Sequence, residues 1–235
     1  MFYYLHLLLL TFTNYIKKYL GFCLQNKQKF KKRHTAIADE DRRAFNVITE
    51  YQNLNAKELK EKSKLFYRNY DVMVLNLSGS LNIGMMIRTA CLYGCEQFYV
   101  VGSKRFDRRS MVGAQNYIKI KKLDNIINNS SNQTEYNLNN FIDFIQTNNY
   151  YPIFVEQGGE DISTVNWDQL TNSIKENNFR LLFIFGSESY GIPESFLSIT
   201  DKKIISIKQY GILRSLNVAV ACGIVLHEYS KTFGA

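Results

Sequence analysis

The sequence has too few cysteines and histidines for a protein that depends on disulfides or on a histidine-bound metal. Its 235 residues include four cysteines, which form no metal-ligand pattern, and three histidines scattered along the chain. Small secreted domains held by disulfides are much richer in cysteine, so a disulfide scaffold is excluded. We therefore expect no metal, and an intracellular location in either the cytoplasm or an organelle.

The sequence also lacks a hydrophobic run that could cross a membrane. The apolar start, residues 1–12, is shorter than the about 20 residues that a transmembrane helix needs, and charge follows it instead of preceding it as in a secretory signal. Acidic residues are absent from residues 1–38, which hold seven basic ones: Lys17, Lys18, Lys27, Lys29, Lys31, Lys32 and Arg33. Three interpretations of this arm stay open: a transit segment, a membrane-surface anchor or an RNA contact.

The rest of the chain is nearly neutral and has the size of one domain. All 21 acidic residues follow residue 38, where 22 basic residues leave a net charge of +1. A hydrophobic content of 46% is enough for a real core. We expect an arm over residues 1–38, a helical lead-in over 39–70 and one folded domain over 71–235. The lead-in rests on apolar residues at helical spacing, namely Ala44, Val47, Ile48 and Tyr51.

From residue 71 onward, short apolar strands alternate with helical segments. A strand, a turn, a helix and a second strand form a βαβ unit, which predicts a mostly parallel sheet with flanking helices. Residues 125–140, rich in Asn and Ser, are expected to be a loop. No G-x-G-x-x-G follows a strand, which argues against an ordinary dinucleotide site. Strands are predicted over residues 72–77, 98–101, 152–155, 181–185 and 204–207, and helices over 81–90 and 141–145.

Residues 204–229 combine a strand, a loop and an apolar segment of helix length. The strand breaks at Gly211, and the loop continues as Arg214-Ser-Leu-Asn217. Open α/β proteins bind ligands where a strand ends in such a loop. Ser215 and Asn217 are equally well suited to cap a helix. The stretch is therefore either a ligand site or a capped core helix.

Two further stretches favour the ligand site. They are Leu81-Asn-Ile-Gly-Met-Met-Ile-Arg-Thr-Ala90 and Leu181-Leu-Phe-Ile-Phe-Gly-Ser-Glu-Ser-Tyr-Gly-Ile-Pro193. With the stretch around Asn217, they resemble in order and spacing the three motifs of the SpoU-type RNA ribose 2′-O-methyltransferases of the SPOUT superfamily. Three separated motifs that match jointly are a specific signal. The resemblance covers about residues 71–229. It implies a C-terminal deep trefoil knot, S-adenosyl-L-methionine as cofactor, structured RNA as substrate and a homodimer.

The resemblance also implies which residues form the site. The catalytic candidates are Asn82, Arg88, Glu188, Ser215 and Asn217. The cofactor-binding candidates are Phe185, Gly186, Glu188, Gly191, Ile207, Gln209, Gly211, Ser215, Leu216 and Asn217. A guanidinium stays protonated, so we expect Arg88 to hold a phosphate and stabilise the developing alkoxide, with Glu188 orienting it. A surface ion pair between Arg88 and Glu188 is the alternative.

Basic residues after the second predicted strand are candidates for RNA contact. They carry positive charge at the carboxyl end of a parallel strand, although a solvated loop would have the same composition. The RNA-binding candidates are Lys104, Arg105, Arg108 and Arg109, together with Arg214.

The chain departs from the family pattern at three positions near the third motif. Lys208 and Gln209 stand where the family usually has Pro-Met, and Ala219 replaces a serine. These changes keep open a catalytically inactive RNA-binding or assembly factor with the same fold. Residues 155–157 and 209–218 look more like eukaryotic enzymes that methylate a D-loop guanosine in tRNA, so we favour tRNA over ribosomal RNA.

Overall fold

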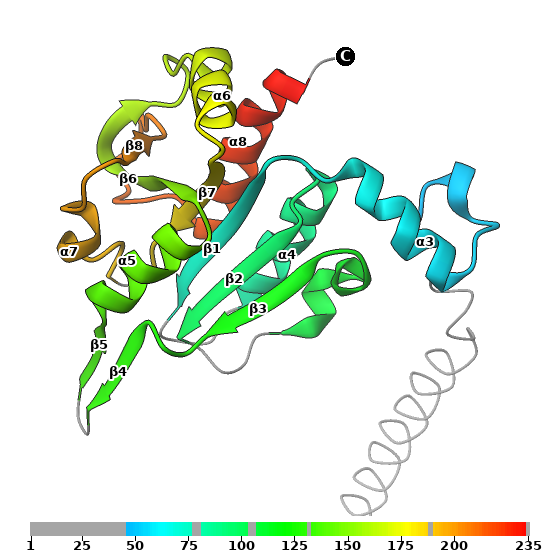
Figure 1. Cartoon of the computed structure of the whole chain (residues 1–235), viewed down its shortest axis with the longest axis horizontal. Coiled ribbons are helices and arrows are strands. Elements are labelled where there is room, and N and C mark those ends of the chain that lie inside the picture. Colours follow the sequence, from blue (N-terminus) through cyan, green and yellow to red (C-terminus); the bar gives the residue numbers. More distant parts are fainter. Residues whose placement is uncertain (1–45, 77–80, 103–106, 131–132, 188–189, 234–235) are drawn as a thin grey trace, which may run out of the picture. The chain divides into compact units, whose positions relative to one another are not determined.

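The computed structural model describes residues 46–76, 81–102, 107–130, 133–187 and 190–233 (Figure 1). The chain divides into two compact units, residues 1–53 and 54–235. The described end of the first unit contains one turn of 3₁₀ helix, η1 (Thr49–Tyr51). The predicted arm lies outside the described residues, as do Lys104, Arg105 and Glu188. The helical lead-in over 39–70 and the domain boundaries therefore stay predictions.

The second unit is built on a six-stranded sheet in which every pair of neighbours is parallel. Its strand order is β3-β2-β1-β7-β6-β8. The expected parallel α/β architecture is confirmed, with six strands in place of the five predicted. The strands are β1 (Tyr70–Asn76), β2 (Gln97–Gly102), β3 (Lys119–Leu123), β6 (Tyr150–Asp161), β7 (Arg180–Phe185) and β8 (Lys203–Ser206).

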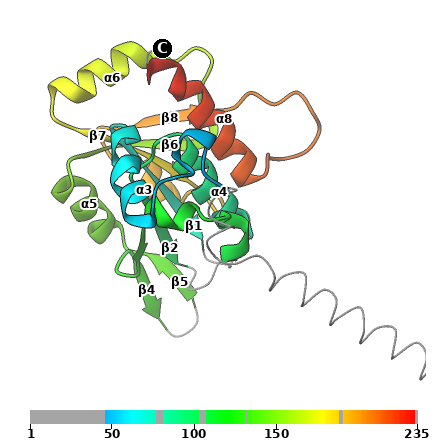
Figure 2. The ribbon, with the colours of Figure 1, turned by 90° about the vertical axis from the view of Figure 1, so that its right-hand side faces the viewer.

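Helices cover both faces of this sheet (Figures 1 and 2). Alternate strand residues point to opposite faces: Val72 packs in the same core as α4, α6 and α8, whereas Met73 packs with α5 and α7. The helices on each side shield the two faces of the sheet from solvent, which is typical of parallel sheets. The helices are α3 (Ala56–Ser63), α4 (Leu81–Leu92), α5 (Leu138–Thr147), α6 (Trp167–Glu176), α7 (Glu194–Leu197) and α8 (Val218–Ser230). Short 3₁₀ helices are η2 (Lys64–Phe66), η3 (Arg108–Met111), η4 (Ala114–Asn116) and η5 (Lys231–Phe233).

Two elements differ from the sequence-based expectation. Residues 125–140 are not a loop: β4 (Ile127–Ser130) and β5 (Gln133–Tyr136) form an antiparallel hairpin, and α5 begins at Leu138. The hairpin extends beyond the carboxyl ends of β2 and β3 (Figure 1). Buried Ile126 and the Tyr136 ring, 5.4 Å from that of Phe196, attach it to the core. The other difference is β3, a lysine-rich strand that the sequence did not predict. It is at the edge of the sheet, where one side of the strand faces solvent and charged residues are tolerated.

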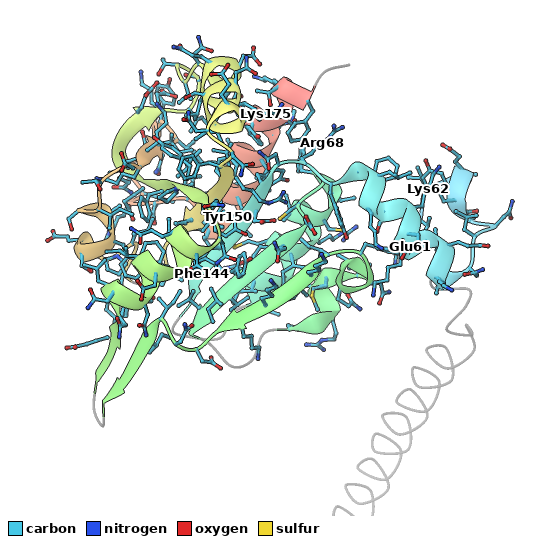
Figure 3. The ribbon with its side chains drawn as sticks, in the orientation of Figure 1. Glu61, Lys62, Arg68, Phe144, Tyr150 and Lys175 are labelled. Carbon is cyan, nitrogen blue, oxygen red and sulfur yellow. The ribbon has the colours of Figure 1, made fainter. Side chains whose placement is uncertain are left out.

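A buried carboxylate joins the amino ends of four strands. Asp71 on β1 accepts hydrogen bonds from Gln97 N on β2 (2.8 Å), the Tyr150 hydroxyl on β6 (2.6 Å) and Arg180 Nε on β7 (2.7 Å). Figure 3 labels Tyr150 beside Phe144 of α5, and their ring centroids are 5.7 Å apart. Because its charge is paired and hydrogen-bonded, Asp71 is tolerated in the core. This network fixes one end of the sheet and leaves the carboxyl ends for the site.

Within the described ranges, no helix is both long and apolar enough to cross a membrane.

Candidate functional site

A cavity of about 370 Å³ opens between residues 155–157 of β6, the carboxyl ends of β7 and β8, and the start of α8. This is the edge at which open parallel sheets bind ligands, and the volume suits a small organic molecule. Its wall mixes apolar side chains, hydroxyls and amides with two charged groups. The lining residues are Val155, Glu156, Gln157, Phe185, Gly186, Ser187, Gly191, Ser206, Ile207, Gln209, Arg214, Ser215, Leu216, Asn217, Val218 and Ala221.

The loop after β7 closes on itself through two glycines. Ser187 and Gly191 exchange backbone hydrogen bonds of 3.0 and 2.9 Å. Gly191 has φ +66°, and a Cβ on Gly186 would lie 2.4 Å from the Gly191 carbonyl carbon. Only residues without a side chain allow this close approach. The second motif therefore forms a tight turn whose backbone faces the cavity.

The loop after β8 is exposed, whereas its junction with α8 is held by a cap. Tyr210, Ile212 and Leu213 expose most of their side chains, and Figure 2 shows the loop as the orange segment extending beyond α8. Asn217 Oδ1 accepts hydrogen bonds from Ala219 N (2.9 Å) and Val220 N (3.4 Å). Asn217 is thus both a helix cap and a cavity residue, which combines the two interpretations of this stretch.

A bulge in β6 holds both of these loops. Glu156 Oε2 accepts a hydrogen bond from Ile192 N (3.1 Å) after the second motif. Gln157 Nε2 donates to the carbonyl of Arg214 in the third motif. Both side chains lie outside the three motifs. The signals in the sequence were their place at the end of a predicted strand and the likeness of residues 155–157 to eukaryotic tRNA enzymes.

Most of the predicted cofactor residues lie around the cavity. Phe185, Gly186, Gly191, Ile207, Gln209, Ser215, Leu216 and Asn217 line it together. Gly211 is exposed and is not a lining residue, and a Cβ added to it would meet nothing within 4 Å. Arg214, predicted to bind RNA, is part of the cavity wall. Sequence reasoning missed the remaining lining residues Val155, Glu156, Gln157, Ser187, Ser206, Val218 and Ala221.

The two candidates of the first motif are on α4 and do not line the cavity. Arg88 is exposed and lies between exposed Met85 and Leu92 along the helix. The opposite side of α4 is buried through Ile83, Met86, Ile87 and Ala90, as its periodicity predicted. Asn82 is half-buried. Arg88 is thus outside the buried face of α4, as its position in the sequence predicted, but it is not part of the cavity wall. Its catalytic role stays a prediction.

The basic cluster after β2 is described only in part. Arg109 donates to both oxygens of Asp107 at 2.7–3.1 Å, and these hydrogen bonds lower the pKa of Asp107. The side chain of Arg108 is outside the described part of the structure. Because Asp107 partly offsets the charge of Arg109, this residue attracts phosphate less than an unpaired arginine would.

The part of the chain that the structure describes contains no group of three or more His, Cys, Asp or Glu that could hold a metal. Cys91, Cys95 and Cys222 are free thiols. Burial raises the pKa of all three, that of Cys91 to about 11. A thiol that stays protonated is a poor metal ligand and a poor nucleophile.

Comparison with known proteins agrees with the motifs. The sequence profile of the SpoU rRNA Methylase family matches residues 69–227. A tRNA (guanosine(18)-2′-O)-methyltransferase from Saccharomyces cerevisiae is 32% identical over 80 residues, which are 32% of this chain and 6% of that protein. The chain thus matches only a small part of this curated relative's length.

Solved structures share the fold. The A. aeolicus TrmH/SpoU tRNA modifying enzyme is 20% identical with a TM-score of 0.57, covering 75% of this chain and 81% of that one. The SpoU methyltransferase AviRb from Streptomyces viridochromogenes, crystallised in complex with the cofactor AdoMet, is 17% identical with a TM-score of 0.53, covering 74% and 62%. Since the family profile spans more than half of the sequence, the chain belongs to the SpoU rRNA Methylase family.

Proposed function

We propose that the protein transfers a methyl group from S-adenosyl-L-methionine to a ribose 2′-hydroxyl in structured RNA. The observation that carries this proposal is the convergence of the second and third family motifs on one cavity at the carboxyl edge of the sheet. Family membership supplies the reaction class, and the cavity supplies a place for a small cofactor.

The cavity fits the chemical groups of this cofactor. Phe185, Ile207 and Leu216 offer apolar contact for its carbon skeleton, and Gln209 and Ser215 offer hydrogen-bonding groups. The tight Gly186–Gly191 turn brings backbone close to the bound molecule. The AviRb structure with AdoMet supports the assignment through the shared fold. When bound, the cofactor supplies an electrophilic methyl group.

Arg88 is our candidate for binding the RNA at the reacting ribose. The 2′-hydroxyl passes its proton to solvent water as it attacks, because a permanently protonated guanidinium cannot take that proton. Arg88 would instead hold the neighbouring phosphate and stabilise the developing alkoxide by charge-assisted hydrogen bonds. Its exposed position on α4 leaves it accessible to a macromolecular substrate. Orientation by Glu188 belongs to the same proposal.

We favour tRNA as the substrate and a guanosine of the D-loop as its target. The yeast relative acts on guanosine 18 of tRNA and shares 32% identity over its matched segment. The family description names ribosomal RNA, which keeps an rRNA 2′-O-methyltransferase as the second candidate.

We also propose a homodimer and, from family membership, a deep trefoil knot in the C-terminal part of the domain. Support for the dimer comes from an exposed apolar surface on two packed helices. Leu81, Met85 and Leu92 recur on one side of α4, and Val220 and Ile224 on α8. We call these five residues the apolar face. Removing apolar side chains of this kind from water lowers the free energy, so a second copy that covers them would be held in place. Arg88 lies among them, so the same interface would bring it close to the partner.

The test is a methylation assay with full-length protein, labelled S-adenosyl-L-methionine and either tRNA or ribosomal RNA transcripts. We expect incorporation into tRNA and a single 2′-O-methylated guanosine when the product is mapped. Preferred incorporation into ribosomal RNA would select the second candidate. RNA binding without any cofactor binding would contradict the enzyme and support an inactive RNA-binding factor.

A further inference from the structure

The bulge in β6 is the starting point for a role that the three motifs do not contain. β6 pairs with β8 through Val155 opposite Ile205, and pairs again through Glu160 opposite the same Ile205. Residues 156–159 therefore leave the ladder. Gly158 has φ +81°, and a Cβ on Gly159 would lie 2.7 Å from the backbone of β8. Bulges of this kind redirect side chains and recur beside active sites.

The redirected Glu156 carboxylate lies against the second-motif loop. Its Oε2 accepts a hydrogen bond from Ile192 N at 3.1 Å, and its Oε1 accepts one from Gln157 N at 2.9 Å. A Cβ on Gly191 would lie 2.8 Å from Oε2. Glu156 thus holds the loop that lines the cavity and is itself one of the lining residues.

Glu156 is also the negative charge of the cavity. Among the described lining residues, the charged side chains are Glu156 and Arg214. Because Glu156 is part of the cavity wall, a charged atom of a ligand bound there lies close enough to interact with the carboxylate. Partial enclosure strengthens such an interaction compared with bulk water.

We propose that Glu156 is a positioning and specificity-determining residue: it holds the second-motif loop, and its charge favours the cationic sulfonium cofactor over the neutral thioether product. This inference rests on the proposed function, because it concerns the same cavity. The neutral product, S-adenosylhomocysteine, would therefore dissociate more readily than S-adenosyl-L-methionine.

The test is calorimetry on the full-length protein with three ligands of matched shape. S-adenosyl-L-methionine carries a sulfonium charge, sinefungin carries an amine in its place, and S-adenosylhomocysteine is neutral there. In Glu156→Gln we expect the affinity for the two cations to fall about tenfold and that for the neutral ligand to fall less than about threefold.

Two further variants separate charge from loop support. Gln157→Ala loosens the third-motif loop without changing charge, so it should weaken all three ligands alike. Glu156→Asp keeps the charge but shortens the reach to Ile192 N, so it should weaken all three while retaining the preference for cations. An equal loss for all three ligands in Glu156→Gln would overturn the proposal, as would loss of the preference in Glu156→Asp. A wild-type protein that binds none of the three would overturn the proposed function as well.

Discussion

At the residue scale, the glycines of the second and third motifs differ in how much space there is for a side chain. Gly186 and Gly191 are in a turn where a Cβ would meet backbone or the Glu156 carboxylate at 2.4–2.8 Å. Gly211 has open space around it. All three interrupt the sequence after an apolar strand and look alike there, so only the packing distinguishes a required glycine from a tolerant one.

We predict that Gly186→Ala lowers cofactor affinity at least tenfold, because its Cβ would push the Gly191 backbone away. Gly211→Ala is the matched control and should bind as the wild type does. Calorimetry with S-adenosylhomocysteine measures both. Unchanged affinity in Gly186→Ala would mean that the turn is not part of the binding site.

Arg88 is the second prediction at this scale. Because it is exposed and does not line the cavity, Arg88→Ala should abolish methyl transfer while cofactor affinity and the urea midpoint of unfolding stay near wild type. Arg88→Lys should recover only part of the activity, since an ammonium lacks the planar fork that binds phosphate. Parallel losses of rate and cofactor affinity would instead assign Arg88 a structural role.

At the scale of elements, α8 depends on the residue that precedes it. Asn217 supplies the acceptor for two backbone N–H groups at the start of a mostly apolar helix. Cys222, Val225 and Leu226 are fully buried, so any loosening of the first turn occurs beside the core.

We predict that Asn217→Ala lowers the free energy of unfolding by about 1 kcal/mol, the usual loss for a removed N-cap. Asn217→Asp keeps the acceptor oxygen and should retain most of that stability. Urea unfolding followed by circular dichroism measures the difference. If alanine and aspartate variants were equally stable, the cap would not contribute to stability.

At the scale of the whole molecule, the apolar face is the feature that a single chain leaves unexplained. Its residues on α4 and α8 are exposed although the opposite sides of both helices pack into the core. A homodimer would cover them and would place Arg88 beside the partner subunit.

We predict that Ile224→Lys shifts the protein from dimer to monomer in light scattering, because a charge would have to be buried at the interface. Leu65→Lys, on η2 outside the apolar face, replaces another exposed aliphatic residue and should leave the assembly unchanged. A wild-type protein that is monomeric and active at low concentration would refute the dimer.

The sequence by itself predicted the parallel α/β architecture, the buried side of α4 and half of the residues that line the cavity. These features are local: periodic apolar residues define strands and helices, and the second and third motifs each follow the strand that positions them. Parallel strands bring their carboxyl ends to one edge, so the motif loops were expected to meet.

Only the tertiary structure decided the rest. The Asn-rich composition of the β4–β5 hairpin predicted a loop. The hairpin packs on the domain through contact between Tyr136 and Phe196, which is distant in the sequence. Strand β3 forms because β2 offers an edge, and its lysines carry no signal of that pairing. Glu156 and Gln157 became part of the site because a bulge lifts them out of the ladder toward loops 36 and 57 residues away. Contacts between residues so far apart produce no periodic pattern in the sequence, so they can be identified only in the folded structure.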